Sequence, residues 1–189
     1  MTLHTSERTV METGAIRRAL MRVAHEIVER HPDTARLILV GIRTRGVPMA
    51  ERLARAIEEF EGVAVEQGAI DIGLHRDDLS LRGVRPTLQP SALPGSLDDR
   101  VVVLVDDVIF TGRSIRAALD ALLDYGRPSA IELAVLVDRG HRELPIRPDY
   151  VGKNVPTQHG DRVLVRLDEI DDGDAVVLTG AGGSATSGE

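Results

Sequence analysis

A length of 189 residues suits one domain, and an apolar fraction of 42% is enough to bury a sizeable core and exclude wholesale disorder. The absence of cysteine excludes disulfide scaffolds, thiolate zinc sites and cysteine nucleophiles. A formal net charge of −7 and an aromatic fraction of 2% argue against a polyanion-binding surface and against base-stacking platforms. Any nucleic-acid role would therefore need a local basic face.

Residues 1–14 lack the apolar core of a signal peptide, and no apolar run approaches the roughly 20 residues of a membrane-spanning helix. We therefore expect a cytoplasmic protein with no membrane partner. Within the chain we expect a flexible N-terminus over residues 1–11, one domain over residues 12–179 and a disordered Gly/Ser-rich tail over residues 180–189.

The first half of the chain alternates helical and strand patterns. Residues 12–30 repeat apolar side chains at three- and four-residue steps, which predicts an amphipathic helix. Its opposite face is basic and carries Arg17, Arg18, Arg22 and His25. Residues 37–40 form a continuous apolar run, typical of a strand buried on both faces. Pro48 marks the beginning of a second helix, and residues 63–72 alternate weakly, as in a second strand.

Prolines and glycines interrupt the pattern over residues 74–99, which predicts a long irregular loop. Strand patterns then return on either side of a helix over residues 114–124. These strands are expected over residues 101–105 and 131–137, with weaker ones over 163–167 and 175–178 around an acidic turn at 168–174. Apolar strands alternating with amphipathic helices predict an α/β fold with a mainly parallel central sheet flanked by helices.

The segment 101–115 carries the strongest chemical signal. An apolar strand runs into two adjacent carboxylates, Asp106 and Asp107, and a short loop then opens a helix. The loop consists of Thr111, Gly112, Arg113 and Ser114. Its backbone amides at a helix N-terminus form a ready anion site, and a phosphate holder beside two hydroxyl acceptors fits a ribose 5-phosphate. The alternative is a solvated strand end followed by an ordinary helix cap.

A second loop, residues 41–47, also connects a strand to a helix. Gly46 permits a close backbone approach, and Thr44 and Arg45 offer a hydroxyl, an amide and a guanidinium to an anion. The alternative is a plain turn with surface arginines.

The segment 101–115 resembles the signature of type I phosphoribosyltransferases, which bind 5-phosphoribosyl 1-diphosphate (PRPP). The resemblance implies the type I phosphoribosyltransferase fold with a flexible active-site loop. It also implies that Asp106 and Asp107 contact the ribose hydroxyls, directly or through metal-bound water, while residues 111–114 hold the 5′-phosphate. The loop 41–47 is similar to the pyrophosphate loop of the same superfamily, which implies a non-proline cis peptide near residues 43–45.

Residues 10–178 resemble one branch more tightly, the PyrR family of pyrimidine operon regulators with uracil phosphoribosyltransferase activity. The matching stretches are 15–20, 22–26, 71–79, 120–128, 133–145 and 150–157, of which 137–145 is the most specific. This resemblance implies a uracil pocket at Asp138 and Arg139, with Asp138 as a further metal contact. It also implies that the flexible loop begins around Arg76, Asp77 and Asp78.

The implied reaction joins uracil and PRPP to give UMP and pyrophosphate. Mg²⁺ on Asp106, Asp107 and Asp138 would act together with Arg45 on the leaving diphosphate. Purine-specific relatives have an aspartate where this chain has Phe110, and PyrR proteins usually have tyrosine there. No dedicated general base is evident, so we expect slow turnover.

The PyrR resemblance further implies binding to a hairpin in pyr mRNA, enhanced by UMP or UTP. The implied RNA face combines Arg17, Arg18, Arg22 and His25 with Arg142, Arg147 and Lys153. Met21, His75 and residues 158–161 depart from the family pattern, and a solvated helix face with structural ion pairs is the alternative. The chain is thus a working transferase, a regulator that uses the nucleotide site as a sensor, or both; a transferase for another base is a third alternative. PyrR proteins form dimers and often tetramers, whereas the sequence pattern alone also allows a monomer.

Overall fold

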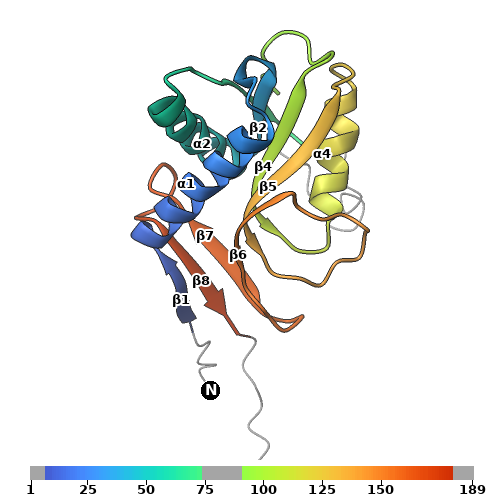
Figure 1. The fold of residues 1–189 in the computed structure, drawn as a ribbon. Helices are drawn as coiled ribbons and strands as arrows, with labels where there is room; N and C mark the ends of the chain where they lie inside the picture. The colour runs from blue at the N-terminus through green and yellow to red at the C-terminus, as the bar shows by residue number, and fades with distance from the viewer. Residues whose placement is uncertain (1–6, 74–90, 181–189) are drawn as a thin grey trace, which may run out of the picture.

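The computed structural model describes residues 7–73 and 91–180. A five-stranded sheet forms its centre (Figure 1), in the order β3-β2-β4-β5-β6. The strands are β2 (Leu37–Ile42), β3 (Glu66–Ile70), β4 (Val101–Ile109), β5 (Ala130–Asp138) and β6 (Tyr150–Asn154). Every pairing between them is parallel, so all carboxyl ends lie at one edge of the sheet. The predicted α/β class with a mainly parallel sheet is confirmed.

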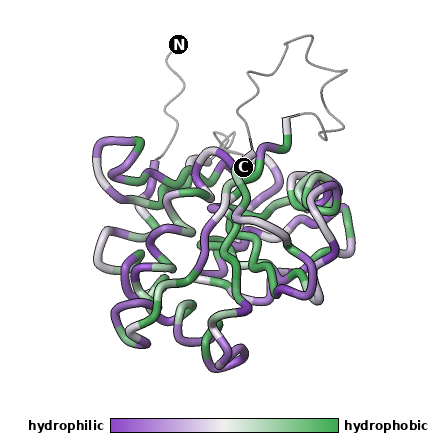
Figure 2. Tube along the Cα trace, turned by 90° about the horizontal axis from the view of Figure 1, so that it is seen from above, coloured by the Kyte–Doolittle hydropathy of each residue, from purple (hydrophilic) through white to green (hydrophobic). Residues whose placement is uncertain are grey.

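Helices cover both faces of the sheet. Helices α1 (Thr13–Arg30) and α2 (Gly46–Glu61) pack on one face, and α4 (Arg113–Leu123) packs on the other. Side chains alternate along a strand, so Leu37 and Leu39 of β2 join the first layer and Ile38 and Val40 join the second. Hydrophobic residues accordingly run through the middle of the molecule in Figure 2. Within the described residues, none of the helices is long and apolar enough to cross a membrane.

A second, antiparallel sheet joins the two ends of the described chain. It contains β1 (Glu7–Glu12), β8 (Ala175–Thr179) and β7 (Arg162–Arg166), in the order β1-β8-β7. Residues 7–11 therefore form part of a strand, and the expected flexible N-terminus over residues 1–11 is wrong for them. Their pattern gives little signal, because Met11 is the one buried residue of β1. Residues 1–6 and 181–189 lie outside the described part of the chain.

The strand β4 is longer than the apolar run predicts. The run ends at Val105, whereas β4 continues to Ile109 and pairs with β5 as far as Asp138. Asp106 and Asp107 consequently lie within the strand and not after it. Backbone pairing with β5 carries the strand past these polar residues, and this long-range contact is invisible in the local pattern.

A buried polar cluster lies toward the opposite edge of the sheet, near the beginning of β5. Glu132 is 7% exposed and accepts a hydrogen bond from the Tyr150 hydroxyl at 2.6 Å. His31 lies 2.9 Å from the same carboxylate, and Arg30 lies 3.1 Å from its other oxygen. Burial and the neighbouring Glu132 carboxylate raise the pKa of Tyr150. The cluster therefore ties the end of α1 to strands β5 and β6.

Replacing Tyr150 with phenylalanine should lower the free energy of unfolding by about 1–2 kcal/mol, because a buried charge-assisted hydrogen bond is lost. Urea unfolding monitored by circular dichroism measures this change. Tyr125→Phe is the matched control, since Tyr125 is 47% exposed. An equal loss in both variants would show that the Glu132 bond contributes nothing.

Candidate active site

The candidate site lies at the carboxyl edge of the central sheet, where β2 and β4 end. These strands pair with Gly41 opposite Val105, so the loop after β2 lies beside the last residues of β4. Gly46 is the first residue of α2 and lies directly against β4. A β-carbon at Gly46 would lie 2.2 Å from the carbonyl oxygen of Val105. A glycine is therefore needed for the loop to approach β4 this closely.

Two carboxylates project from the last part of β4. The N–H of Asp107 donates to Oδ1 of Asp106 at 3.0 Å, and the N–H of Val108 donates to Oδ1 of Asp107 at 2.8 Å. Burial and then repulsion by Asp107 raise the pKa of Asp106 well above its usual range. Burial also raises the pKa of Asp107, against the opposing effects of the Val108 N–H and of the Arg45 charge. A bound cation would relieve this repulsion, so the pair fits a divalent metal. The carboxylate oxygens can also accept hydrogen bonds, so the pair fits a ribose diol as well.

The loop from Thr111 to Ser114 joins β4 to α4. Gly112 has φ = 92° and directly precedes the helix. The Thr111 hydroxyl accepts the N–H of Arg113 at 3.3 Å, and the Thr111 carbonyl accepts the N–H of Glu143 at 2.9 Å. The first amides of an α-helix have no acceptor within it, so the beginning of α4 offers N–H groups to an anion at this edge.

The loop after β2 contains a cis peptide bond between Arg43 and Thr44, at the place expected from the phosphoribosyltransferase resemblance. Arg45 lies at its end, directly before α2. The Arg45 Nε donates to the carbonyl of Val165 at 2.7 Å, and its Nη2 donates to the two carboxylate oxygens of Asp171 at 3.0 and 3.1 Å. Two loops that each lead into a helix and a carboxylate pair thus meet at one edge of the sheet.

The chain shares this arrangement with known proteins. A family model described as "Phosphoribosyl transferase domain" matches residues 9–168. "Bifunctional protein PyrR" of Chloroflexus aurantiacus is 57% identical over 173 residues, which cover 92% of this chain and 95% of that protein. The chain belongs to the PyrR family. "Bifunctional protein PyrR" of Bacillus subtilis is 54% identical and covers 89% of this chain and 94% of its own length.

Solved structures agree with PyrR membership at the level of the fold. A Trypanosoma cruzi hypoxanthine phosphoribosyl transferase superposes with a TM-score of 0.71 at 20% identity, covering 95% of this chain and 94% of that one. Another Trypanosoma cruzi structure of the enzyme gives 0.67 at 21% identity, covering 90% and 95%. The type I phosphoribosyltransferase fold predicted from the signature segment is therefore confirmed.

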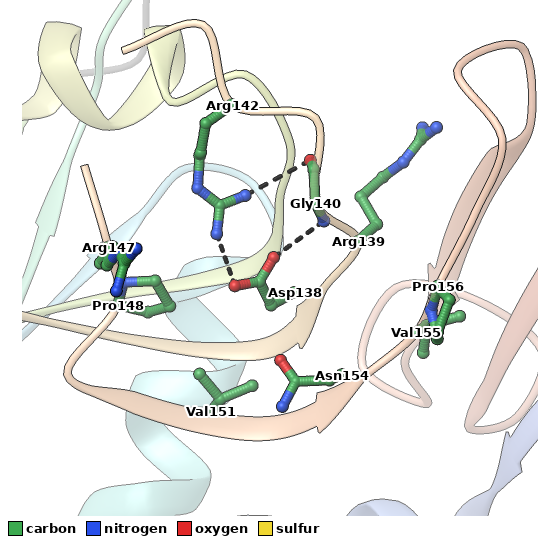
Figure 3. Close-up of a pocket in the computed structure, with 10 residues that line it drawn as sticks. All are labelled: Asp138, Arg139, Gly140, Arg142, Arg147, Pro148, Val151, Asn154, Val155 and Pro156. Atoms are coloured by element: carbon green, nitrogen blue, oxygen red, sulfur yellow. Dashed lines mark hydrogen bonds and ion pairs between the residues drawn. The ribbon is translucent and has the colours of Figure 1, made fainter. Parts of the chain in front are cut away.

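Asp138 does not join the carboxylate pair. It lies opposite Ile109, three residues beyond Asp106 along the paired strands. Its Oδ1 accepts the N–H of Gly140 at 2.9 Å, and its Oδ2 pairs with Arg142 (Figure 3). Among the described residues, no group of three acidic or histidine side chains that could hold a metal is found. The predicted metal set of Asp106, Asp107 and Asp138 is thus not assembled in this structure.

Arg139 turns away from Asp138 (Figure 3) and places its guanidinium 4.0 Å from the centre of the Phe110 ring. The ring centroid of His159 lies 5.6 Å from that of Phe110, and the His141 centroid lies 6.0 Å from it. No role in the site was predicted for His141 or His159. His141 comes shortly after the buried strand β5, and this position was a signal because ligands gather at strand ends. His159 comes after β6, where the sequence pattern predicts no strand, so it carried no such signal.

Asp138 and Arg142 instead line a pocket of about 500 Å³ between the loop after β5 and β6 (Figure 3). Its other lining residues are Arg139, Gly140, Arg147, Pro148, Val151, Asn154, Val155 and Pro156. Arg142 donates to the carbonyls of Phe110 and Ile146 at 2.9 and 3.0 Å, as well as to Asp138. It therefore braces the loop after β5 and is not a free surface cation.

The other predicted RNA-binding residues spread over α1 and β6. Arg22 donates to the carbonyls of Val151 and Gly152 at 3.1 and 2.7 Å and so ties α1 to β6. His25 instead stacks on Phe60 of α2, with ring centroids 4.0 Å apart. Arg17, Arg18, Arg147 and Lys153 are exposed. The predicted flexible-loop residues Arg76, Asp77 and Asp78 lie outside the described part of the chain.

Proposed function

We propose that this protein transfers the phosphoribosyl group of PRPP to uracil, giving UMP and pyrophosphate, and that it regulates pyrimidine gene expression through nucleotide-dependent binding to a pyr mRNA hairpin. The observation that carries the transferase proposal is the meeting of a carboxylate pair with two loops that open helices at one sheet edge. Relatives of more than 50% identity named as bifunctional PyrR proteins support the combination of two roles.

In the proposed reaction, the bond between C1′ and the diphosphate oxygen breaks as uracil N1 bonds to C1′, and the proton of N1 is released to solvent. Positive charge grows on the ribose ring, and negative charge grows on the leaving diphosphate. We assign the diphosphate to Thr44, Arg45 and Gly46, whose loop lies beside β4. We assign the 5′-phosphate to the helix-opening loop of Thr111, Gly112, Arg113 and Ser114, and the ribose hydroxyls to Asp106 and Asp107. Holding both ends of PRPP would fix C1′ for attack.

The carboxylate pair fits Mg²⁺ through its chemistry. Burial and mutual repulsion disfavour the ionised forms of Asp106 and Asp107, and a hard cation would offset both effects. When bound, Mg²⁺ would neutralise part of the charge on the diphosphate. Asp106 and Asp107 are the residues that would hold it. Asp138 is engaged with Gly140 and Arg142, so its part in metal binding would require those bonds to open.

We place uracil at the segment of Asp138 and Arg139, where the chain leaves β5 beside the Phe110 ring.

The test of the transferase activity is the release of pyrophosphate from PRPP in the presence of Mg²⁺ with uracil as the acceptor. Hypoxanthine is the control acceptor, because the similar solved structures are hypoxanthine enzymes. Turnover with uracil alone supports the proposal; turnover with hypoxanthine and none with uracil would contradict it.

For RNA, we propose a basic surface over α1 and β6 that includes Arg17, Arg18, Arg22, His25, Arg147 and Lys153, with Arg142 supporting the loop beneath. Replacing Arg147 and Lys153 with glutamine should weaken retention of a pyr hairpin and reduce the salt slope by about 0.7–0.9 per lost phosphate contact. Arg116→Gln on α4 is the control, since Arg116 is exposed on the helix that covers the other face of the central sheet.

Filter binding with and without UMP across salt concentrations measures this effect. A chain that releases pyrophosphate but retains no pyr hairpin would be a transferase or nucleotide sensor without RNA binding, which is the alternative function. We also propose a homodimer or homotetramer located in the cytoplasm, and light scattering of the purified protein tests the assembly.

A further inference from the structure

The acidic turn between β7 and β8 lies against the loop that carries Arg45. Its Asp171 carboxylate receives the Nη2 group of Arg45 at 3.0 and 3.1 Å, and the carbonyl of Val165 receives the Nε group at 2.7 Å. These acceptors come from two places, the turn and the end of β7. Together they fix both the position and the plane of the guanidinium, although the Arg45 side chain is still 35% exposed.

The turn itself is rigidly held. The N–H of Leu167 donates to Oδ2 of Asp171 at 3.0 Å, and the N–H of Asp171 donates to the Leu167 carbonyl at 2.6 Å. Arg52 of α2 pairs with both Glu169 and Asp174 of the same turn at 2.6 and 2.7 Å. These hydrogen bonds hold the Asp171 carboxylate in one position. The Leu167 N–H and then the Arg45 charge lower the pKa of Asp171, which keeps it ionised at neutral pH.

The Arg45 guanidinium keeps one free end. Among the described residues, its Nη1 group makes no hydrogen bond, whereas Nε and Nη2 are both engaged. Its charge also acts on Asp107 of the carboxylate pair. The Nε and Nη2 groups of the guanidinium are therefore bound to the protein, and the Nη1 group remains for an anion.

We infer that Asp171 is a positioning residue: it holds Arg45 so that the free edge of the guanidinium faces the diphosphate of PRPP. Asp171 touches neither the reacting atoms nor the substrate in this arrangement and acts only through Arg45. The inference rests on the proposed phosphoribosyl transfer. Preorganisation is the physical gain, because a long side chain that is already ordered loses less conformational freedom when the diphosphate binds.

The test compares Asp171→Asn with Asp172→Asn in the full chain. Asp172 is the neighbouring carboxylate, is exposed, and makes no hydrogen bond or ion pair among the described residues, so its variant controls for the lost charge. We expect Asp171→Asn to raise the KM for PRPP and the Kd for pyrophosphate about 5-fold, as expected when one long side chain must be ordered on binding. The Kd for UMP should stay unchanged, because UMP lacks the diphosphate, and Asp172→Asn should leave all three constants unchanged.

A double-mutant cycle with Arg45→Gln separates positioning from a general structural role. If Asp171 acts through Arg45, Asp171→Asn should have no further effect on pyrophosphate binding in the Arg45→Gln background. A fall in the KM for PRPP would overturn the inference, because it would mean that Asp171 competes with the diphosphate for Arg45. An equal loss of UMP affinity would also overturn it. If the wild-type protein releases no pyrophosphate from PRPP, the proposed function fails before the inference is tested.

Discussion

Replacing Asp106 with asparagine should lower transferase activity about 100–1,000-fold, because the proposed ligand of the ribose hydroxyls and of Mg²⁺ is lost. The same change should stabilise the protein without ligands at pH 8 by about 0.5–2 kcal/mol. The reason is that Asp106 lies beside Asp107 in a partly buried place that disfavours its charge. Asparagine keeps the carbonyl oxygen that accepts the Asp107 N–H and removes the repulsion.

The pH dependence of stability follows from the same pKa. The pKa of Asp106 is raised in the folded protein, so the folded state binds its proton more tightly than the unfolded chain does. The stability of the wild type should therefore decrease as pH rises from the ordinary aspartate value of 3.8 through the raised pKa. This decrease should be smaller in Asp106→Asn.

Melting temperatures at pH 5 and pH 8, together with pyrophosphate release, measure both effects. Asp120→Asn on α4 is the control: Asp120 is an exposed carboxylate paired with Arg116 at 3.3 Å, and its loss should change neither quantity appreciably. A lower melting temperature of Asp106→Asn at pH 8 would contradict the prediction.

Replacing Gly46 with alanine should have the other large effect. Its β-carbon would lie 2.2 Å from the carbonyl oxygen of Val105 and 3.3 Å from the carbonyl carbon of Gly41, so backbone must move. Overpacking of this kind costs about 1–3 kcal/mol of stability. Displacement of the loop that carries Arg45 should also lower kcat/KM for PRPP about 100-fold.

Steady-state kinetics and urea unfolding test this expectation. Gly14→Ala is the matched control, because its β-carbon would meet only the flexible end of Arg18 at 3.4 Å and because alanine favours the first turn of α1. We expect Gly14→Ala to be fully active and slightly more stable. Wild-type kinetics in Gly46→Ala would show that the close approach of the loop to β4 is not needed.

Local pattern predicts the layers of this fold well, because buried strands and amphipathic helices carry strong periodicity. It misses β1 and β6, which contain one buried residue each, Met11 and Tyr150, and it ends β4 four residues early at Val105. All three errors concern strands that depend on pairing with another strand of the sheet. A local pattern holds no information about such partners.

The candidate site likewise contains residues that the sequence reveals and pairings that it does not. Asp106, Asp107 and the loop after them are contiguous, so the sequence reveals them together. Arg45 and Asp171 are 126 positions apart, and nothing in either segment predicts their pairing. Asp138 and Arg142 are close in sequence, but their ion pair depends on the path of the loop after β5. The residues of the proposed site are therefore visible in the sequence, whereas the contacts that fix Arg45 and Asp138 are not.

The small antiparallel sheet has a consequence for engineering the chain. Glu7 lies opposite Thr179 in the register of β1 and β8, so a short peptide linker could join the two ends into a closed circle, and new termini could be opened in a surface turn elsewhere. Because β1 pairs with β8, shortening either strand should destabilise the small sheet. Removal of β1 residues would loosen β8, then β7, and finally the Val165 carbonyl that accepts the Arg45 hydrogen bond.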